Sequence, residues 1–359
     1  MSPQVGKKLN LPKKTSRLIL WIGVLVCTTA LQSNAMAETA KSETHALGRF
    51  WRTFLDRAFD TRARIPKPSL DIEWRARKVG TVQLEEPVLA LSMYDLDGDG
   101  VSEMFVLTEN SIALLRMKDS KIAIESLLPI DEPRSITGPR SSVGQIEFVA
   151  DRALVRSSRL SKGVMFSLSG KELRKEASIS GFPFCGDGKA ELVTGRDYFE
   201  QITSKSKRFG FTPVPKRFYS SRCVDHIFDS TNRRMHILGL VSTDRVLHIY
   251  CDRGGKPCRA SPAQNREYRG VGSVFGITDV NRDGSPEVLV SSARPPGDTD
   301  SVTVYARKQE SVVEVFKAAF KTGIVGISSG DFAGQGRRQV WVGAREPGSE
   351  ELEVWSLSE

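Results

Sequence analysis

Two stretches of this chain place oxygen-bearing side chains at the spacing of a calcium-binding loop. One runs from Asp95 to Glu103 and the other from Asp279 to Glu287. Calcium takes about six to eight oxygen ligands, so oxygens at alternate positions and a glycine for the sharp turn can wrap one ion. The predicted ligands, at positions 1, 3, 5, 7 and 9 of the two loops, are Asp95, Asp97, Asp99, Val101 and Glu103, and Asp279, Asn281, Asp283, Ser285 and Glu287.

Neither loop fits an EF-hand. An EF-hand loop has about twelve residues, lies between helices and ends in a bidentate Glu, whereas position 12 is Val106 in one loop and Val290 in the other. The flanks 88–91 and 104–107 are short and rich in large apolar residues, which is typical of strands. A solvated hairpin tip is the alternative for one Asp-rich turn. Two copies with the same Gly and the same final Glu favour the metal site.

The first 37 residues have the layout of a secretory signal. Five basic residues precede the apolar run Leu18–Leu31, and Ala35-Met36-Ala37 follows it. This pattern predicts a signal peptide cleaved after Ala37 and a periplasmic or secreted mature protein. The apolar run is shorter than the roughly 20 residues that a membrane span needs. A signal anchor is the alternative.

Removal of the signal peptide takes away most of the positive charge. The formal net charge of the whole chain is +9, and residues 38–359 keep 47 basic and 43 acidic side chains, a net charge of +4. A charge of this size gives no basis for a nucleic-acid partner, which we exclude from the expected partners.

Four cysteines remain in the predicted mature chain. An even count in an exported protein favours disulfides. Cys251 and Cys258 flank a short turn that could bring their sulfurs together, which leaves Cys185 to pair with Cys223. Free buried thiols are the alternative.

The loop motif recurs in weaker form along the chain. Its fifth position falls at Asp99, Asp187, Asp283 and Gln335, at spacings of 88, 96 and 52. The first two spacings are twice 44 and twice 48, so further units are expected near 143 and 233. Six units of this size have the length of propeller blades.

Each complete unit reads as four strands. In the first unit these are 88–94, 104–108, 111–117 and 121–128; in the fifth they are 273–278, 287–292, 301–305 and 311–316. The sixth unit has only 324–328, 340–343 and 351–356, and the segment Thr81–Leu84 could supply its fourth strand. We therefore predict an all-β fold, a propeller of six four-stranded blades over residues 70–359, closed by the N-terminal strand. Seven blades are the alternative.

An apolar strand, the pattern Asp-x-Asp-x-Asp-Gly-x-x-Glu and a second apolar strand resemble the FG-GAP/VCBS repeat family. These are the calcium-looped propeller repeats of integrin α-subunit heads and of many exported bacterial proteins, and the resemblance covers roughly residues 80–359. It implies a structural Ca²⁺ in the two complete loops. The loops at Asp187 and Asp331 depart from the ligand pattern, so metal binding is not extended to them.

One helix is predicted before the ring. Residues 45–60 place apolar side chains three and four apart, with basic residues opposite, and Pro66 and Pro68 follow in a linker. The predicted domains are thus 1–37, 38–69 and 70–359. The helix could pack on the propeller, or it could dock a partner or contact a membrane surface.

No catalytic motif identifies an enzyme. The chain lacks a Gly-x-Ser-x-Gly elbow and a phosphate-binding glycine loop, and His226, His236 and His248 lack metal-ligand spacing. We therefore expect a binding or scaffold module for a protein or polysaccharide partner, with loops such as 204–208 and 294–298 as contact candidates. The alternative is a hydrolase or lyase with a site in the axial channel, acting on an extracellular polymer. The sequence does not indicate an oligomeric state.

Overall fold

The computed structural model describes residues 72–134, 144–149, 152–157, 159–169, 172–179, 181–184, 191–194, 218–228, 234–252, 266–292, 299–308 and 311–358. The chain divides into two units, Met1–Ile65 and Pro66–Glu359. The predicted signal peptide and the predicted helix 45–60 lie outside the described residues, as do the loops 204–208 and 294–298.

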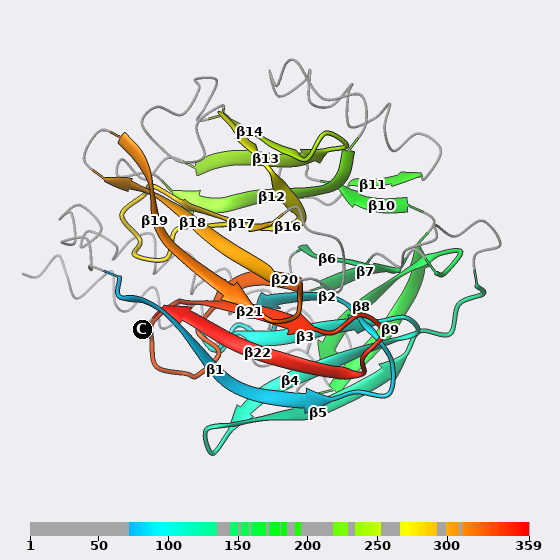
Figure 1. The fold of residues 1–359 in the computed structure, drawn as a ribbon. Coiled ribbons are helices and arrows are strands. Elements are labelled where there is room, and N and C mark those ends of the chain that lie inside the picture. Colours follow the sequence, from blue (N-terminus) through cyan, green and yellow to red (C-terminus); the bar gives the residue numbers. More distant parts are fainter. Residues whose placement is uncertain are drawn as a thin grey trace, which may run out of the picture. The chain divides into compact units, whose positions relative to one another are not determined.

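The second unit is a β-propeller with five four-stranded antiparallel blades in its described residues (Figure 1). Blade 1 comprises β2 (Val88–Tyr94), β3 (Glu103–Thr108), β4 (Ser111–Lys118) and β5 (Lys121–Pro129), and blade 2 comprises β6 (Gly144–Val149), β7 (Arg152–Ser157), β8 (Gly163–Ser169) and β9 (Glu172–Ile179). Blade 3 comprises β12 (Phe218–Phe228), β13 (Arg234–Ser242), β14 (Val246–Asp252) and β15 (Arg266–Arg269), and blade 4 comprises β16 (Val271–Thr278), β17 (Glu287–Ser292), β18 (Asp300–Lys308) and β19 (Ser311–Phe320). Blade 5 comprises β20 (Gly323–Gly330), β21 (Gln339–Arg345), β22 (Glu351–Ser358) and β1 (Trp74–Gln83), and a separate pair is formed by β10 (Gly181–Phe184) and β11 (Glu191–Thr194).

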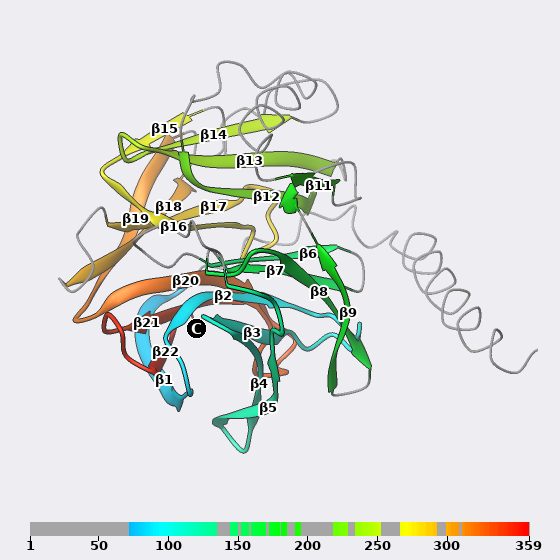
Figure 2. The same ribbon diagram turned by 90° about the vertical axis from the view of Figure 1, so that its right-hand side faces the viewer.

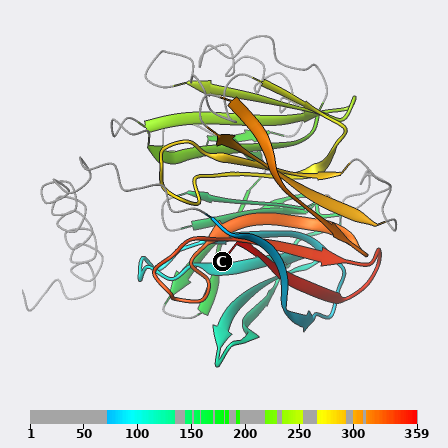
Figure 3. The same ribbon diagram turned by 60° about the vertical axis from the view of Figure 1, so that its left-hand side comes forward.

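Blade 5 closes the ring as the sequence predicts. β1 pairs antiparallel with β22, so that Thr81 lies opposite Glu353 and Val82 opposite Leu352. Figure 3 shows the blue β1 beside the red β22 near the end of the chain. This pairing covers the edge that β22 would otherwise expose.

The core lies between neighbouring blades. In β3, Phe105 and Leu107 join a cluster shared with blade 2, whereas Met104 and Val106 join a cluster shared with blade 5. Similar clusters join blade 3 to blade 4 and blade 4 to blade 5. Successive strand residues point to opposite faces, and both faces of blades 1, 4 and 5 are covered. These second strands are therefore continuous apolar runs rather than alternating ones.

The first strand of each blade lies innermost. β2 and β16 both contact β20, while β2 also contacts β6 and β16 contacts β12. Gly326 of β20 packs so closely on blade 1 that a Cβ atom there would lie 2.5 Å from Cβ of Leu91. A glycine is therefore required at this contact between inner strands.

The predicted number of six blades is wrong for the part of the chain that the structure describes. The third predicted unit, around Asp187, contributes the two-stranded pair β10–β11, which lies beside β12 (Figure 2). The turns between first and second strands fall near 99, 150, 231, 283 and 335. Most of these turns follow one another at the spacing of a single blade, but the gap from 150 to 231 is too long for one blade and too short for two. Dividing the spacings of 88 and 96 residues into two equal units each therefore predicts one blade too many.

Candidate metal centre

The two predicted calcium loops connect the first two strands of their blades, as the flanking sequences predict. The first loop joins β2 to β3 in blade 1, and the second joins β16 to β17 in blade 4. Both make the same turn. The carboxylate of Asp95 accepts a hydrogen bond from the amide of Gly100 at 3.0 Å, and that of Asp279 accepts one from the amide of Gly284 at 2.9 Å.

The ninth residue of each loop folds back beneath the turn. One carboxylate oxygen of Glu103 accepts a hydrogen bond from the amide of Leu96, and one of Glu287 accepts a bond from the amide of Val280, both at 2.9 Å. Glu103 is 1% exposed and Glu287 is 3% exposed. The ninth residue of the motif is therefore a buried carboxylate beneath each loop. This residue is also the first residue of an otherwise apolar strand, β3 in one case and β17 in the other.

Left-handed backbone at two positions makes the turn. The fourth and sixth residues have positive φ in both loops: Gly98 and Gly100 in the first, and Arg282 and Gly284 in the second. Gly tolerates this region freely, whereas a side chain there is unfavourable. Arg282, at φ 58°, shows that the second loop keeps the turn at a conformational cost.

A third loop has the turn without the predicted ligands. Asp331 accepts hydrogen bonds from the amides of Gln335, at 2.8 Å, and Gly336, at 2.5 Å. Its ninth residue is Gln339, whose amide group donates to the carbonyl of Ser358 instead of folding beneath the loop. The turn is therefore separable from metal ligation, and this loop provides a natural control. The loop at Asp187 lies outside the described residues.

The oxygens of the complete loops suit a hard cation. In the first loop, ligand atoms of Asp95, Asp97 and Asp99 lie within 4.8 Å of one another. Oδ1 of Asp95 is buried and has no hydrogen-bond partner in the described part of the chain. In the second loop, the same holds for Oγ of Ser285, at the seventh position. Buried oxygens without a donor are costly, so each loop has an unsatisfied oxygen that a cation would complete.

Burial changes the acidity of both ninth-position carboxyls. Burial raises the pKa of Glu103 to about 7 and that of Glu287 to about 8, and the amide bonds from Leu96 and Val280 counteract only part of this effect. Burial likewise raises the pKa of Asp95 and of Asp279. Without a metal, burial therefore disfavours the charged form of both ninth-position carboxyls.

This acidity predicts a pH dependence of the metal-free protein. Glu287 binds its proton more tightly in the folded state than in the unfolded state, where its pKa is near 4.5. In the presence of a chelator, the contribution of Glu287 to the free energy of unfolding should therefore be fully present below pH 4.5 and be lost as the pH rises to about 8, so that the protein becomes less stable between pH 5 and 8. Thermal melts at a series of pH values check this fall. Glu287→Gln should make it shallower, the exposed Glu351→Gln should not, and melting temperatures that rise between pH 5 and 8 would contradict it.

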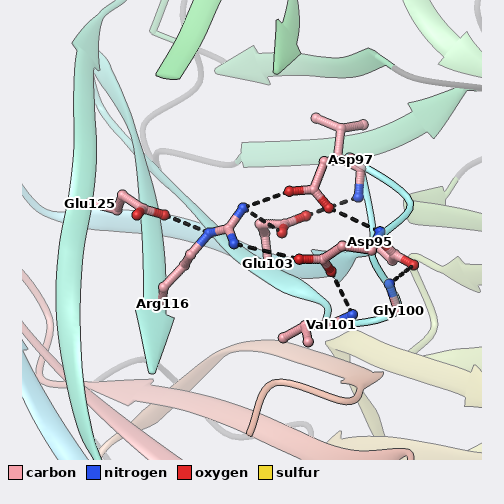
Figure 4. Close-up of polar contacts among 9 residues, drawn as sticks. Asp95, Asp97, Gly100, Val101, Glu103, Arg116 and Glu125 are labelled. Carbon is pink, nitrogen blue, oxygen red and sulfur yellow. Dashed lines mark hydrogen bonds and ion pairs between the residues drawn. The ribbon is translucent and has the colours of Figure 1, made fainter. Parts of the chain in front are cut away.

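A basic residue that the sequence analysis did not predict contacts the carboxylates of the first loop (Figure 4). Nη2 of Arg116, on β4, lies 2.9 Å from Oδ2 of Asp97 and 2.8 Å from Oε1 of Glu103. Its Nε lies 2.5 Å from Oε2 of Glu125 on β5. The hairpin could have revealed this contact, because a two-residue turn at Glu109-Asn110 places Arg116 opposite Glu103.

Two titratable side chains converge on the axis of the ring. Nη1 of Arg222, on β12, donates to the carbonyl of Ile327 on β20 at 2.8 Å, and so joins two blades that are not neighbours. Glu147, on β6, interacts electrostatically with Arg222 and accepts a hydrogen bond from Gln145 at 3.3 Å. Burial raises the pKa of Glu147 to about 6, although the positive charge of Arg222 opposes the rise. No sequence motif marks this pair.

Cys251 is disulfide-bonded, but the side chain of its partner is outside the described residues. The Cys251–Cys258 and Cys185–Cys223 pairings therefore stay predictions. The described residues contain no helix that is long and apolar enough to cross a membrane.

Comparisons with known proteins find similar folds but no family. No family model matches the sequence, and no curated protein matches it. The structure is similar to a protein from Thermus thermophilus described as an oxidoreductase (glucose dehydrogenase), with a TM-score of 0.39 and 12% identity over 79% of this chain and 100% of that one. It is also similar to the soluble aldose sugar dehydrogenase of Escherichia coli, with a TM-score of 0.43 and 11% identity over 80% and 99% of the two chains. Similarity at this level does not bear on activity.

Proposed function

We propose that this chain is an exported, calcium-stabilised β-propeller of FG-GAP/VCBS type that acts as a binding or scaffold module for a protein or polysaccharide. The observation that carries the proposal is the pair of loops in blades 1 and 4. They share the turn and the buried ninth-position Glu, and each has a buried oxygen without a hydrogen-bond partner among the described residues: Oδ1 of Asp95 in the first loop and Oγ of Ser285 in the second. The third loop, at Asp331, has the turn without this donor set.

Calcium would have a structural role in this protein. Asp95, Asp97, Asp99, the carbonyl of Val101 and Glu103 would hold one ion, and Asp279, Asn281, Asp283, Ser285 and Glu287 would hold the other. Each ion would replace repulsion among carboxylates by coordination and would satisfy oxygens that the fold buries. The ligands lie in connections between strands, so the ion would stabilise a blade without taking part in chemistry.

The predicted export of the chain would suit this role. The predicted signal peptide, residues 1–37, would direct the chain to the periplasm or the exterior. Extracellular calcium-binding modules work with dissociation constants that reach the millimolar range, so even a weak calcium site can be occupied there. Disulfides suit the same compartment. The helix 45–60 would add a contact with the propeller, a partner or a membrane surface.

The second candidate is an axial-channel hydrolase or lyase, which the Glu147–Arg222 pair favours. A Glu with a pKa near 6 can serve as a general acid or base at neutral pH. A guanidinium nearby can bind an anionic group of a polymer. Against this, Arg222 is engaged by the carbonyl of Ile327 in the described structure.

One experiment separates the two candidates. The mature chain is immobilised in calcium buffer and exposed to a periplasmic extract and to a set of cell-envelope polysaccharides, and both retention and cleavage of the polysaccharides are measured. Retention of one component without cleavage, unchanged in Glu147→Gln, is the result expected of a binding module. Cleavage that Glu147→Gln reduces at least a hundredfold would establish the enzyme instead.

A further inference from the structure

The first calcium loop already holds a cation, the guanidinium of Arg116. Nη2 of this residue lies within 2.9 Å of the third-position ligand, Asp97, and of the ninth-position ligand, Glu103. Its Nη1 lies 4.0 Å from the fifth-position ligand, Asp99. Arg116 therefore contacts three of the four carboxylates that a metal would use.

Arg116 is fixed in this place by the blade. Its side chain is only 17% exposed, and Nε lies 2.5 Å from a carboxylate oxygen of Glu125, whose side chain is 9% exposed. The hairpin register places Arg116 beside Glu103, because Met104 pairs with Leu115 one step away. Arg is a fixed, delocalised cation with a planar fork of donors, so it can contact several carboxylates at once.

The second loop has no such residue. Val288 pairs with Tyr305, so the residue in the position of Arg116 is Ala306, whose side chain carries no charge. Among the described residues, no Lys or Arg lies within ion-pair distance of Asp279, Asp283 or Glu287. Arg338 affects Asp279 only through a longer-range charge interaction.

We propose that Arg116 is the built-in cation of the first loop, so that this loop keeps its shape without calcium and the second loop is the high-affinity calcium site. The inference rests on the proposed calcium role and assigns it unequally to the two loops. A metal entering the first loop would have to displace the guanidinium from Asp97 and Glu103 and would be repelled by its charge. Among the described residues, a metal entering the second loop would displace no Lys or Arg, and the charge of Arg338 acts on Asp279 only at longer range.

The test compares the full mature chain with Arg116→Gln, Asp283→Ala and the double variant, and uses Lys308→Gln, on the exposed end of β18, as the matched control. Calorimetric titration with calcium chloride gives the number of sites and their affinities. Thermal melts in a chelator give the stability of the metal-free proteins. Arg116→Lys keeps the positive charge but lacks the planar guanidinium. It serves as a second, milder variant in case Arg116→Gln does not fold.

The expected result is one tight site in the natural chain, absent in Asp283→Ala. Arg116→Gln should raise the affinity of the first loop at least tenfold, so that it binds a second ion, and the double variant should keep this new site alone. In the chelator, Arg116→Gln should melt about 5 °C lower than the natural chain, and Arg116→Lys should melt between them. Lys308→Gln should match the natural chain.

Two results would overturn the inference: two sites of equal affinity that Arg116→Gln leaves unchanged, or equal melting of Arg116→Gln and the natural chain in the chelator. A different result would refute the proposed calcium role. If no protein binds calcium while Arg116→Gln still melts lower, Arg116 remains the cation of the first loop and the loops are not metal sites.

Discussion

The melting temperature of the mature chain should fall by about 5 to 10 °C when calcium is removed by a chelator. A ligand that binds only the folded state stabilises it by about 2.7 kcal/mol at a hundredfold excess over Kd, which corresponds to a shift of this size in a large domain. Differential scanning calorimetry in excess calcium and in chelator measures it. Calcium should restore the higher value, and magnesium should not, because it requires a smaller octahedral site.

Single substitutions, tested in the same way, show which loop binds the calcium that stabilises the protein. Asp283→Ala should remove most of the shift, because this carboxylate belongs to the loop without a competing cation, and Asp97→Ala should remove a smaller part. Asp331→Ala is the matched control. It removes the hydrogen bonds from Gln335 and Gly336, so it should lower melting equally with and without calcium. An identical melting curve before and after chelation would refute the metal assignment.

Val82→Asp should destabilise the protein more than any loop variant, with a fall of about 10 °C or more in melting temperature. Val82 is 5% exposed in β1 and packs among residues of blades 1 and 5. A carboxylate there would be buried without a partner, which costs several kcal/mol. Melting monitored by circular dichroism checks the result.

Gln83→Asp is the matched control for the closing strand. Gln83 is the next residue along β1, and it is exposed because successive side chains point to opposite faces. It should change the melting temperature by no more than a few degrees. If the two variants melted alike, the pairing of β1 with β22 would not be what holds the ring.

Local patterns were enough to predict most strands. The four strands expected at 88–94, 104–108, 111–117 and 121–128 coincide with β2 to β5 within about one residue. Apolar runs bounded by Asp-rich and Gly-rich turns define such strands because the inner strands of blade 1 are buried on both faces. The closing strand was predictable for a related reason, since three strands at the end of the chain required a fourth.

Long-range features could not be read from the sequence. The blade count depended on the long stretch between the turns near 150 and 231, where spacing alone cannot distinguish a blade from an insertion. The meeting of Glu147 with Arg222 depends on the closure of the whole ring, and no local pattern encodes it. Arg116 is an intermediate case, because the two-residue hairpin fixes its register but only the structure shows that Glu125 holds it in place.

The pairing of β1 with β22 also sets the order of events during folding. β1 is synthesised before the blades and β22 after them, and the ion pair between Lys78 and Glu353 spans 275 positions in the sequence. Bringing such distant segments together costs about 5 kcal/mol of chain entropy if nothing between them is ordered, and this cost shrinks as the intervening blades form. Ring closure should therefore be a late folding step, and until then the open edge of β22 is exposed to strands of other molecules.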